Sequence, residues 1–418
     1  MGRPPPFAVP IALDLIANAR LPSKRAQSLQ VVQVAAAFAR QGLAVRLLHA
    51  RRIPTPSLPP GQDLFRYYGV PTEPAPEVQA LPCIDWIDRV PGPLQFLPAR
   101  LQEWSFCRAA ARAVLAGREP GRVAPLVLSR EIESAARLVA AGHRGVFLEL
   151  HRVPGGRLRQ ALLRQALRGV AGVIAISGGV AQDLARFGVR EPHLVIEHDG
   201  VELAPYATGK PQAVARAAIG VPADVPLAVY TGSLLPWKGV AIVIEAARRL
   251  PAVRFVVAGG TDADLARLRP LASGLTNLRL DGFQPPERVA DYVIAADLFV
   301  VPNRSRPAIS ARYTSPLKVF EAMAAGVPIV ASDLPSLRDI LTPQEEAVFV
   351  EPDDPEALAR GIAGLLADPH ARMQMGKRLR IRAPRHSWQR RAQRLVAWMS
   401  ARTGLESAAD RQTAASQT

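Results

Sequence analysis

The organisation of the chain is clearest in residues 227–258, LAVYTGSLLPWKGVAIVIEAARRLPAVRFVVA. The apolar run Leu227–Thr231 has the length and composition of a buried strand. Residues 240–250 then repeat apolar side chains at the three-to-four spacing of a helix, and Arg254–Ala258 is a second apolar run. Parallel strands need a crossover connection, which is usually a helix. The stretch therefore predicts a strand-helix-strand unit of a parallel sheet.

The same alternation continues on both sides of this stretch. Towards the C-terminus it runs to residue 366, and the N-terminal half opens with a strand at Val9–Ile16 and a helix at Ala26–Arg40. An irregular stretch at 203–215 separates the two series. The sequence therefore predicts an α/β protein of two doubly wound, Rossmann-like domains. The expected boundaries are residues 1–203 and 204–385.

Three regions fall outside this alternation. Residues 51–100 are rich in proline, which predicts loops and irregular connections. The pattern at Ala392–Met399 predicts an amphipathic helix beyond the second series, preceded by His386-Ser387-Trp388. The polar residues 403–418 are expected to be disordered.

Composition excludes two broad classes of protein. A chain of 418 residues that is 49% hydrophobic can bury enough surface to fold, so disorder is not its main state. The sequence has no uninterrupted apolar run of about 18 residues and no apolar signal-peptide core at its start. We therefore expect a soluble, cytoplasmic protein. Cys83 and Cys107 have no metal-ligand spacing, and no metal site is expected.

The charge is strongly basic, with 52 Lys and Arg against 36 Asp and Glu, a net charge of +16. Such an excess favours polyanions, whether nucleic acid, an anionic lipid surface or a small phosphate-bearing substrate. Only five of the basic residues are lysine, and two of these, Lys238 and Lys318, follow predicted strands or open predicted helices. Lysine in so arginine-rich a chain is consistent with a need for a compact ammonium group.

The segment Tyr313–Gly326 has well-marked helix ends. Ser315 is expected as the N-cap with Pro316 at the first helical position, and Gly326 ends the helix. Lys318 and Glu321 share one face near the helix start, where free N–H groups and the helix dipole attract anions. The alternative is a capped core helix that carries a surface ion pair.

The loop Thr231–Gly239 follows a predicted strand and precedes a helix. Doubly wound sheets bind ligands at the carboxyl ends of their strands, so Lys238 is placed to reach a phosphate there. The spacing is not that of a Walker A motif. An ordinary connecting loop is the alternative.

His151 directly follows a predicted strand, and so does the loop that contains Pro22–Gln27. A histidine at a strand end is well placed for catalysis or substrate contact, although a structural role is the alternative. The helix near 157–168 carries an arginine stripe opposite its leucines, which suits either an anionic membrane or a solvated surface. The stripe is formed by Arg157, Arg164 and Arg168, and the leucines are Leu158, Leu162, Leu163 and Leu167.

Taken together, these segments resemble the GT-B glycosyltransferases of family 4, which are retaining enzymes that use nucleotide sugars, in a variant with Ser-Pro-Leu-Lys at residues 315–318. The resemblance is carried by Tyr230–Gly239, Asp281–Phe283, Ala295–Pro302, Ser315–Asp333 and Val348–Pro355, and more weakly by Glu149–His151, Ala175–Ser177 and His198–Glu202. The helix that begins near Trp388 resembles the one that crosses back to the N-terminal domain, over residues 386–402. The N-terminal domain would then bind the acceptor and the C-terminal domain the donor.

The resemblance implies a role for each matching residue. Glu321 would hold the donor ribose, Lys238 and the backbone of Ser315–Leu317 the diphosphate, and His151 the transferred sugar. Front-face attack is the implied mechanism, in which the leaving phosphate takes the acceptor proton. His151 and Lys238 would be the catalytic residues. The expected donor-nucleotide residues are Gly232, Ser233, Lys238, Gly282, Phe283, Ser315, Pro316, Leu317, Lys318 and Glu321, and those of the donor sugar and acceptor are Ser23, Lys24, Gln27, Tyr313 and Thr314.

Two positions depart from the family pattern. The family commonly has a second Glu seven residues before Glu321, where this chain has Thr314, and an Arg where it has Ser233. These departures leave a weakly active or inactive binding member of the family as an alternative. A sugar-nucleotide epimerase of the same fold is a second alternative. A nucleic-acid or membrane scaffold, suggested by the net charge of +16, is a third. The co-substrate is expected to be a UDP- or GDP-sugar, with no cofactor and no essential metal. An anionic membrane surface is a candidate partner, and nucleic acid is not expected.

Overall fold

The computed structural model describes residues 11–71, 73–117 and 124–404. Contacts between residues divide the chain into two compact units. Unit 1 comprises the chain up to Ile176, residues 180–197 and the chain from Trp388 onwards. Unit 2 comprises residues 177–179 and 198–387.

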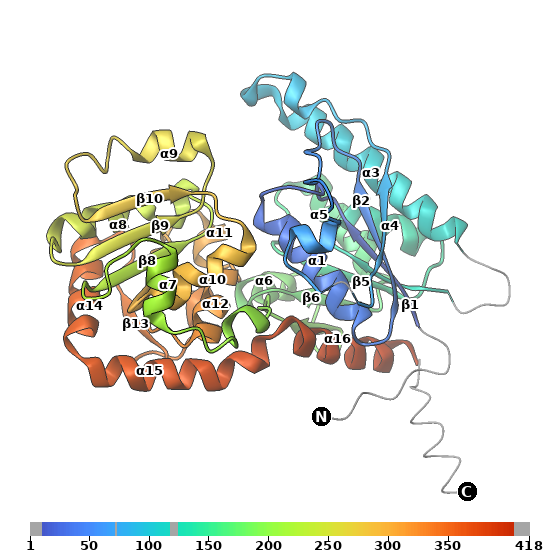
Figure 1. Cartoon of the computed structure of the whole chain (residues 1–418). Coiled ribbons are helices and arrows are strands. Elements are labelled where there is room, and N and C mark those ends of the chain that lie inside the picture. The colour runs from blue at the N-terminus through green and yellow to red at the C-terminus, as the bar shows by residue number, and fades with distance from the viewer. Residues whose placement is uncertain (1–10, 72, 118–123, 405–418) are drawn as a thin grey trace, which may run out of the picture. The chain divides into compact units, whose positions relative to one another are not determined.

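Unit 1 is built on a seven-stranded parallel sheet in the order β3-β2-β1-β4-β5-β6-β7. The order places β1 beside both β2 and β4, as in a doubly wound fold. Its strands are β1 (Ala12–Ala17), β2 (Ala44–Ala50), β3 (Glu77–Leu81), β4 (Leu126–Ser129), β5 (Val146–Leu150), β6 (Gly172–Ala175) and β7 (Leu194–Ile196). Its helices are α1 (Ala26–Ala39), α2 (Leu64–Tyr67), α3 (Phe96–Ala116), α4 (Ile132–Ala140), α5 (Arg157–Leu167), most of α6 (Gly178–Ala185) and α16 (Trp388–Thr403), with short 3-10 turns at Ile87–Arg89 and Gly92–Leu94 (Figure 1).

Unit 2 repeats this arrangement with a six-stranded parallel sheet in the order β10-β9-β8-β11-β12-β13. Its strands are β8 (Leu227–Thr231), β9 (Arg254–Ala258), β10 (Leu278–Gly282), β11 (Leu298–Val301), β12 (Ile329–Ser332) and β13 (Ala347–Val350). Its helices are α7 (Gln212–Ala218), α8 (Val240–Arg249), α9 (Asp262–Leu268), α10 (Pro286–Ala295), α11 (Ala308–Ala311), α12 (Leu317–Ala325), α13 (Pro335–Arg338), α14 (Pro355–Ala367) and α15 (Pro369–Arg382), with 3-10 turns at Ala204–Tyr206, Pro236–Lys238 and Ala383–His386.

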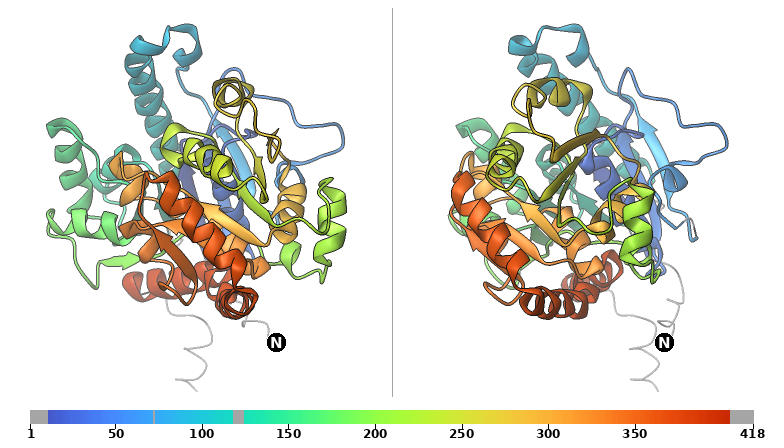
Figure 2. Two further views of the ribbon diagram at one scale, coloured as in Figure 1. Left: turned by 90° about the vertical axis from the view of Figure 1, so that its left-hand side faces the viewer. Right: turned by 60° about the vertical axis from the view of Figure 1, so that its left-hand side comes forward.

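Each sheet lies between layers of helices, as the two rotated views show (Figure 2). In unit 2 the core side chains Val229, Phe255, Phe299 and Phe320 are fully buried between sheet and helices. The predicted α/β class with two doubly wound, Rossmann-like domains is therefore confirmed.

The last helix, α16, belongs to unit 1 although unit 2 precedes it in the sequence. It packs on α1, and its Trp398 ring lies 5.4 Å from the ring of Phe147 on β5. Gly172 allows this approach, because a Cβ there would lie 2.3 Å from Trp398. The predicted C-terminal helix is present and is longer than Ala392–Met399.

The structure corrects several expectations for local elements. The proline-rich region 51–100 holds α2, β3 and the start of α3, and it is not all loop. A helix absent from the prediction, α15, follows α14. The start of α12 also differs, because Pro316 is its N-cap and the Ser315 hydroxyl accepts a hydrogen bond from the Asp199 N–H at 2.8 Å. The first residues of the predicted strand at Val9–Ile16 and residues 405–418 of the predicted tail lie outside the described residues.

Candidate functional site

The carboxyl ends of β8 and β11 define the candidate site of unit 2. These strands are neighbours, but β8 continues to β9 on one side and β11 to β12 on the other. Strand order reverses at this point, and such a switch point is where open parallel sheets bind ligands. The loop 232–239, Asn303 and the start of α12 follow these strands or pack beside them.

Lys238 lies at the end of the 3-10 turn that follows β8. Its side chain is 9% exposed, and its Nζ lies 4.2 Å from the centre of the Trp237 ring. Gly239 closes the turn at φ 75°, and a Cβ at that position would lie 1.8 Å from the Pro302 carbonyl oxygen. Burial lowers the pKa of Lys238 to about 8.

Lys318 enters the same region from the first turn of α12. Its Nζ is buried, has no hydrogen-bond partner and lies 3.3 Å from the centre of the Tyr230 ring. Burial lowers the pKa of Lys318 well below its ordinary value, and the charge of Lys238 lowers it further. A Cβ on Gly232 would lie 3.2 Å from the Lys318 Nζ, so glycine at the end of β8 leaves room for the ammonium group.

Glu321 lies one turn further along α12 and is partly buried. Burial raises the pKa of Glu321 to about 7, while the charge of Lys318 acts in the opposite direction. Among the described residues, neither lysine has a carboxylate within ion-pair distance. The predicted alternative of a surface ion pair between Lys318 and Glu321 is therefore wrong, since Lys318 is buried and unpaired. Two buried lysines without a paired carboxylate among the described residues have the charge that suits a polyvalent anion.

The other predicted donor residues lie around these strand ends. Ser233 is exposed, and its carbonyl accepts a hydrogen bond from the Tyr230 hydroxyl at 2.6 Å. Gly282 ends β10 at φ 68°, and the Phe283 side chain is 37% exposed. In the segment before α12, Ser315 and Pro316 are buried and Leu317 is partly buried, while Tyr313 stacks beside Arg312 and the buried Thr314 donates to the Ile309 carbonyl.

Sequence reasoning missed two residues at the carboxyl end of this sheet, Gly259 and Asn303. Gly259 follows β9 at φ 127°, and a Cβ there would lie 2.0 Å from the Gly232 carbonyl oxygen. Asn303 is fully buried with both amide atoms lacking a hydrogen-bond partner, and the Thr231 hydroxyl also lacks one. The only signal for Gly259 and Asn303 in the sequence was that each lies within two residues of the end of a strand.

His151 lies at the carboxyl end of β5 in unit 1. Its Nε2 lies 3.0 Å from Oε1 of Glu149 and 2.6 Å from Nη2 of Arg130. Arg130 also donates to the Gln30 side chain of α1 at 3.0 Å. The predicted histidine is therefore part of a polar cluster that joins three elements of unit 1.

The predicted loop at Pro22–Gln27 lies after β1. Ser23 is buried, and its N–H donates to the Tyr68 hydroxyl at 2.7 Å while its carbonyl accepts from that hydroxyl at 2.8 Å. Lys24 and Gln27 are exposed. The structure therefore places Ser23 in contact with Tyr68, directly after α2, and leaves the Lys24 and Gln27 side chains at the surface.

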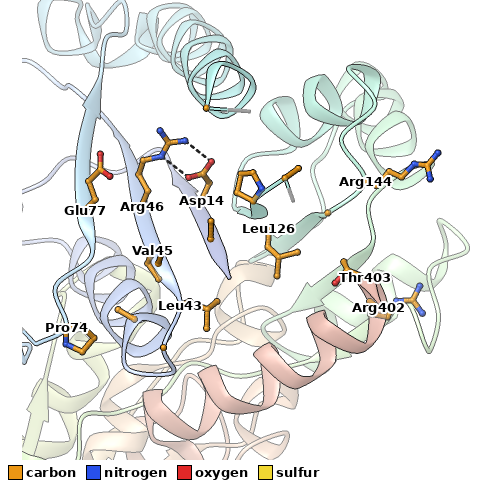
Figure 3. A pocket seen from close by; sticks show the side chains of 18 of the residues that line it. Asp14, Leu43, Val45, Arg46, Pro74, Glu77, Leu126, Arg144, Arg402 and Thr403 are labelled. Carbon is orange, nitrogen blue, oxygen red and sulfur yellow. Dashed lines mark hydrogen bonds and ion pairs between the residues drawn. The ribbon is translucent and has the colours of Figure 1, made fainter. Parts of the chain in front are cut away.

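In unit 1, a pocket of 1230 Å³ opens at the end of the sheet opposite to the carboxyl ends of its strands (Figure 3). It lies at the amino ends of the strands, where Arg46 donates two hydrogen bonds of 2.8 Å to Asp14. Because this pair satisfies its own charges and the edge is opposite to the carboxyl ends of the strands, we do not place the candidate site there.

Within the described ranges, one group of side chains has the spacing of metal ligands, since atoms of Cys107, Glu131 and Glu133 lie within 4.8 Å of one another. Burial raises the pKa of the Cys107 thiol well above its ordinary value and that of Glu131 to about 7. Glu133 pairs with Arg159 at 3.3 Å. Oε1 of Glu131 also accepts a hydrogen bond from the Asn18 N–H at 3.0 Å, so both carboxylates of this group already have partners within the protein.

Comparison with known proteins finds a family match within unit 2. Residues 212–382 match the family described as glycosyl transferases group 1. A D-inositol 3-phosphate glycosyltransferase of Xylanimonas cellulosilytica is 30% identical over 231 residues, which cover 52% of this chain and 53% of that protein. One from Mycolicibacterium paratuberculosis is 32% identical over 210 residues, 48% of this chain and 46% of that protein. The matches thus span about half the length of these relatives.

Solved structures match the fold of nearly the whole chain. Sucrose-phosphate synthase of Thermosynechococcus elongatus superimposes with a TM-score of 0.73 at 21% identity, covering 95% of this chain and 100% of that one. Anabaena HepE in complex with UDP-glucose has a TM-score of 0.70 at 15% identity, covering 94% and 100%. The fold is that of the GT-B glycosyltransferases.

The resemblance found in the sequence is thereby confirmed at the level of class. Residues 212–382 are similar to group 1 glycosyl transferases. Its assignment to family 4 and to a Ser-Pro-Leu-Lys variant stays a prediction. Among the described residues, no helix combines the length and apolar character needed to cross a membrane.

Proposed function

We propose that this protein is a retaining glycosyltransferase that moves a sugar from a nucleoside-diphosphate sugar to an acceptor. The observation that carries the proposal is the pair of buried ammonium groups, Lys238 and Lys318, at the switch point of unit 2. A diphosphate supplies the negative charge that these groups lack. The relationship to named glycosyltransferases supports the same reaction class.

The chemistry follows from where charge develops. When the bond between sugar and diphosphate breaks, negative charge builds on the leaving oxygen, and preorganised cations at that point lower the barrier. Lys238 and Lys318 would supply this stabilisation. Glu321, partly buried on the same helix as Lys318, would accept hydrogen bonds from the ribose hydroxyls. The leaving phosphate would take the acceptor proton, with His151 beside the transferred sugar.

The proposed donor is a UDP- or GDP-sugar, with no resident cofactor required. A structural neighbour is described in complex with UDP-glucose, which favours UDP among the two. The acceptor is a glycan, a lipid-linked sugar or a small metabolite.

The first experiment is a thermal-shift panel of UDP, GDP, ADP and CMP and their common sugar conjugates. A ligand that binds only the native state raises the unfolding midpoint by mass action. We expect a selective shift with one nucleoside diphosphate that is lost in Lys318→Met and kept in Lys377→Met, which removes an exposed lysine of unit 2. No shift with any of them at millimolar concentration would overturn the proposed donor. With the donor known, NMR of the product's anomeric centre tests retention.

We also propose an anionic membrane surface as a partner of unit 1. Along α3, Leu97, Arg100, Trp104 and Arg108 fall on one exposed face, with Leu97 62% and Trp104 43% exposed. Leu158 of α5 is 86% exposed and lines the same groove as Trp104, although the sequence had grouped it with the leucines opposite the arginine stripe. Exposed apolar side chains among arginines are typical of surfaces that bind anionic lipid.

Vesicle sedimentation tests this surface. We expect binding to vesicles of phosphatidylcholine with phosphatidylglycerol, no binding to phosphatidylcholine alone, and loss of binding in Trp104→Ser with Leu158→Ser. The control replaces Met373 and Ile381, which are 61% and 70% exposed on α15 in unit 2. Equal loss in the control, or equal binding to both vesicles, would contradict the proposal.

A further inference from the structure

Arg391 of α16 is the largest fully buried side chain among the described residues, at 2% exposure. An arginine stays charged at any ordinary pH, so it is rarely buried without an anion beside it. Its Nη2 donates to Oε2 of Glu149 at 2.7 Å, and this carboxylate is 1% exposed. A helix near the end of the sequence thus contributes a charge to the carboxyl end of β5.

Glu149 uses its two oxygens for different partners. While Oε2 accepts from Arg391, Oε1 lies 3.0 Å from Nε2 of His151 and 3.5 Å from Nε of Arg130. Burial alone would raise the pKa of Glu149, but Arg391, His151 and Arg130 together hold it well below its ordinary value. The carboxylate is therefore a permanent acceptor that faces the histidine ring.

Two guanidinium groups already balance this one carboxylate, so the cluster needs no proton on His151. The ring nitrogen that meets Glu149 is also 2.6 Å from Nη2 of Arg130. Protonated, Nε2 donates to Glu149; unprotonated, it accepts from Arg130. The charged groups in contact with the ring include Glu149 from β5 and Arg130 after β4, and Arg391 of α16 lies behind Glu149.

We propose that Glu149 and Arg391 are positioning residues for His151: Arg391 fixes the Glu149 carboxylate, and Glu149 fixes the orientation and protonation of the His151 ring. The inference rests on the proposed function, in which His151 contacts the transferred sugar. It adds the last helix of the chain to the residues that govern this contact.

A second ion pair on α16 provides a control. It distinguishes a role of Arg391 in positioning His151 from a role in attaching α16 to the sheet. Three residues beyond Arg391, Arg394 donates two hydrogen bonds of 2.6 and 2.8 Å to Glu197, which follows β7. This pair also ties α16 to the sheet, but among the described residues Glu197 has no contact with His151. Arg394→Met is therefore a matched control for the loss of one arginine from α16.

The test is an NMR titration of the His151 ring in protein with labelled histidine, where His151→Ala assigns the signal among seven histidines. Removing the carboxylate in Glu149→Gln should lower the pKa of His151 by about one unit or more, and removing the cation in Arg391→Met should raise it. Loosened packing alone is not expected to shift the pKa of His151 in opposite directions in these two variants. Arg391→Lys should restore most of the wild-type titration and serves where Arg391→Met does not fold.

Kinetics supply the second readout. We expect Glu149→Gln to lower kcat at least tenfold with donor KM nearly unchanged, and Arg394→Met to leave kcat near the wild-type value. The proposal is overturned if the His151 titration in Glu149→Gln and Arg391→Met matches that in Arg394→Met. Because the titration needs no substrate, it decides the positioning role even if the wild-type chain transfers no sugar, a result that would contradict only the proposed function.

Discussion

The two units treat buried charge in opposite ways. In unit 1, Glu149 is surrounded by Arg391, Arg130 and His151, and each charge has an opposite charge within hydrogen-bond or ion-pair reach. In unit 2, Lys238 and Lys318 are buried near each other with no carboxylate paired to either among the described residues. The first arrangement pairs its opposite charges internally and can hold a side chain in place. The second leaves two lysines without a paired carboxylate, as the proposed diphosphate site requires.

The choice of residue matches this difference. Arginine stays charged and binds a carboxylate in a fixed geometry, which suits the permanent pairs of unit 1. Lysine loses its proton more readily when buried, as the lowered pKa values of Lys238 and Lys318 show. A site that must wait without its anion is therefore better built from lysine. This chain has 52 basic residues and places two of its few lysines there.

The strongest test of the comparison is removal of a paired charge from unit 1. Arg391→Met should lower the free energy of unfolding by about 3–5 kcal/mol, because it leaves the Glu149 carboxylate buried beside a weaker set of partners. Arg394→Met should cost only about 0–1 kcal/mol, since the Arg394 side chain is 47% exposed. Urea unfolding of both variants measures the difference. Equal losses of unfolding free energy in the two variants would show that the buried Arg391–Glu149 pair stabilises the protein no more than the exposed Arg394–Glu197 pair.

Removal of an unpaired charge from unit 2 should have the opposite effect on stability. Lys318→Met takes away a buried cation without a partner, so we expect no loss of unfolding free energy, while affinity for the nucleoside diphosphate falls by about 1.5–3 kcal/mol, roughly 10- to 150-fold. Calorimetric titration with UDP and GDP and thermal unfolding provide the two values. A destabilised variant with unchanged affinity would make Lys318 a structural residue.

The variant Glu321→Ala tests whether a second residue of α12, besides Lys318, contacts the donor nucleotide. We expect donor affinity to fall by about 1–3 kcal/mol, because two ribose hydroxyls lose their acceptor. The matching 2′,3′-dideoxy nucleoside diphosphate should bind wild type and variant equally. If the variant loses the same affinity for both nucleotides, Glu321 does not contact the ribose.

The smallest expected effect is a pH dependence. The pKa of Lys238 is about 8 in the free protein, so between pH 7 and pH 9 the site loses a proton that the bound anion requires. Affinity for the diphosphate should fall about tenfold over this range, and Lys238→Met should abolish the change. Stability of the free protein should move the other way. The folded pKa lies below the unfolded value, so the unfolded chain holds more protons between about pH 8 and 10, and stability rises with pH in that window.

Much of the fold could be predicted because its signals are local. Apolar runs that alternate with helical periodicity, as in residues 227–258, predict the strands and helices of a doubly wound fold from short stretches of sequence. The missed elements lack that signal. The strand β3 is an edge strand whose side chains are only partly buried, and α15 has charged residues around most of its surface. Neither has a continuous apolar face.

The candidate site could be predicted in unit 2 and only in part in unit 1. Lys238 and Lys318 each follow a strand or open a helix within a recognisable motif, so the sequence indicated their position at the carboxyl ends of the strands. Arg391 has no such motif, since its partner Glu149 lies 242 residues away in the sequence. Pairing over that distance depends on tertiary structure, and a lone arginine in an amphipathic helix gives no indication of it.

The place of α16 in unit 1 has a consequence for how the chain matures on the ribosome. Unit 1 is interrupted after Glu197 and completed only from Trp388 onwards. At roughly 5–20 residues per second, the ribosome needs roughly 10–40 s to make the intervening segment, and during that time Glu149 has no Arg391 to pair with. The cluster around His151 is therefore completed late in synthesis, although most of unit 1 is made first. A nascent chain that stops before α16 carries a finished unit 2 beside an unfinished unit 1.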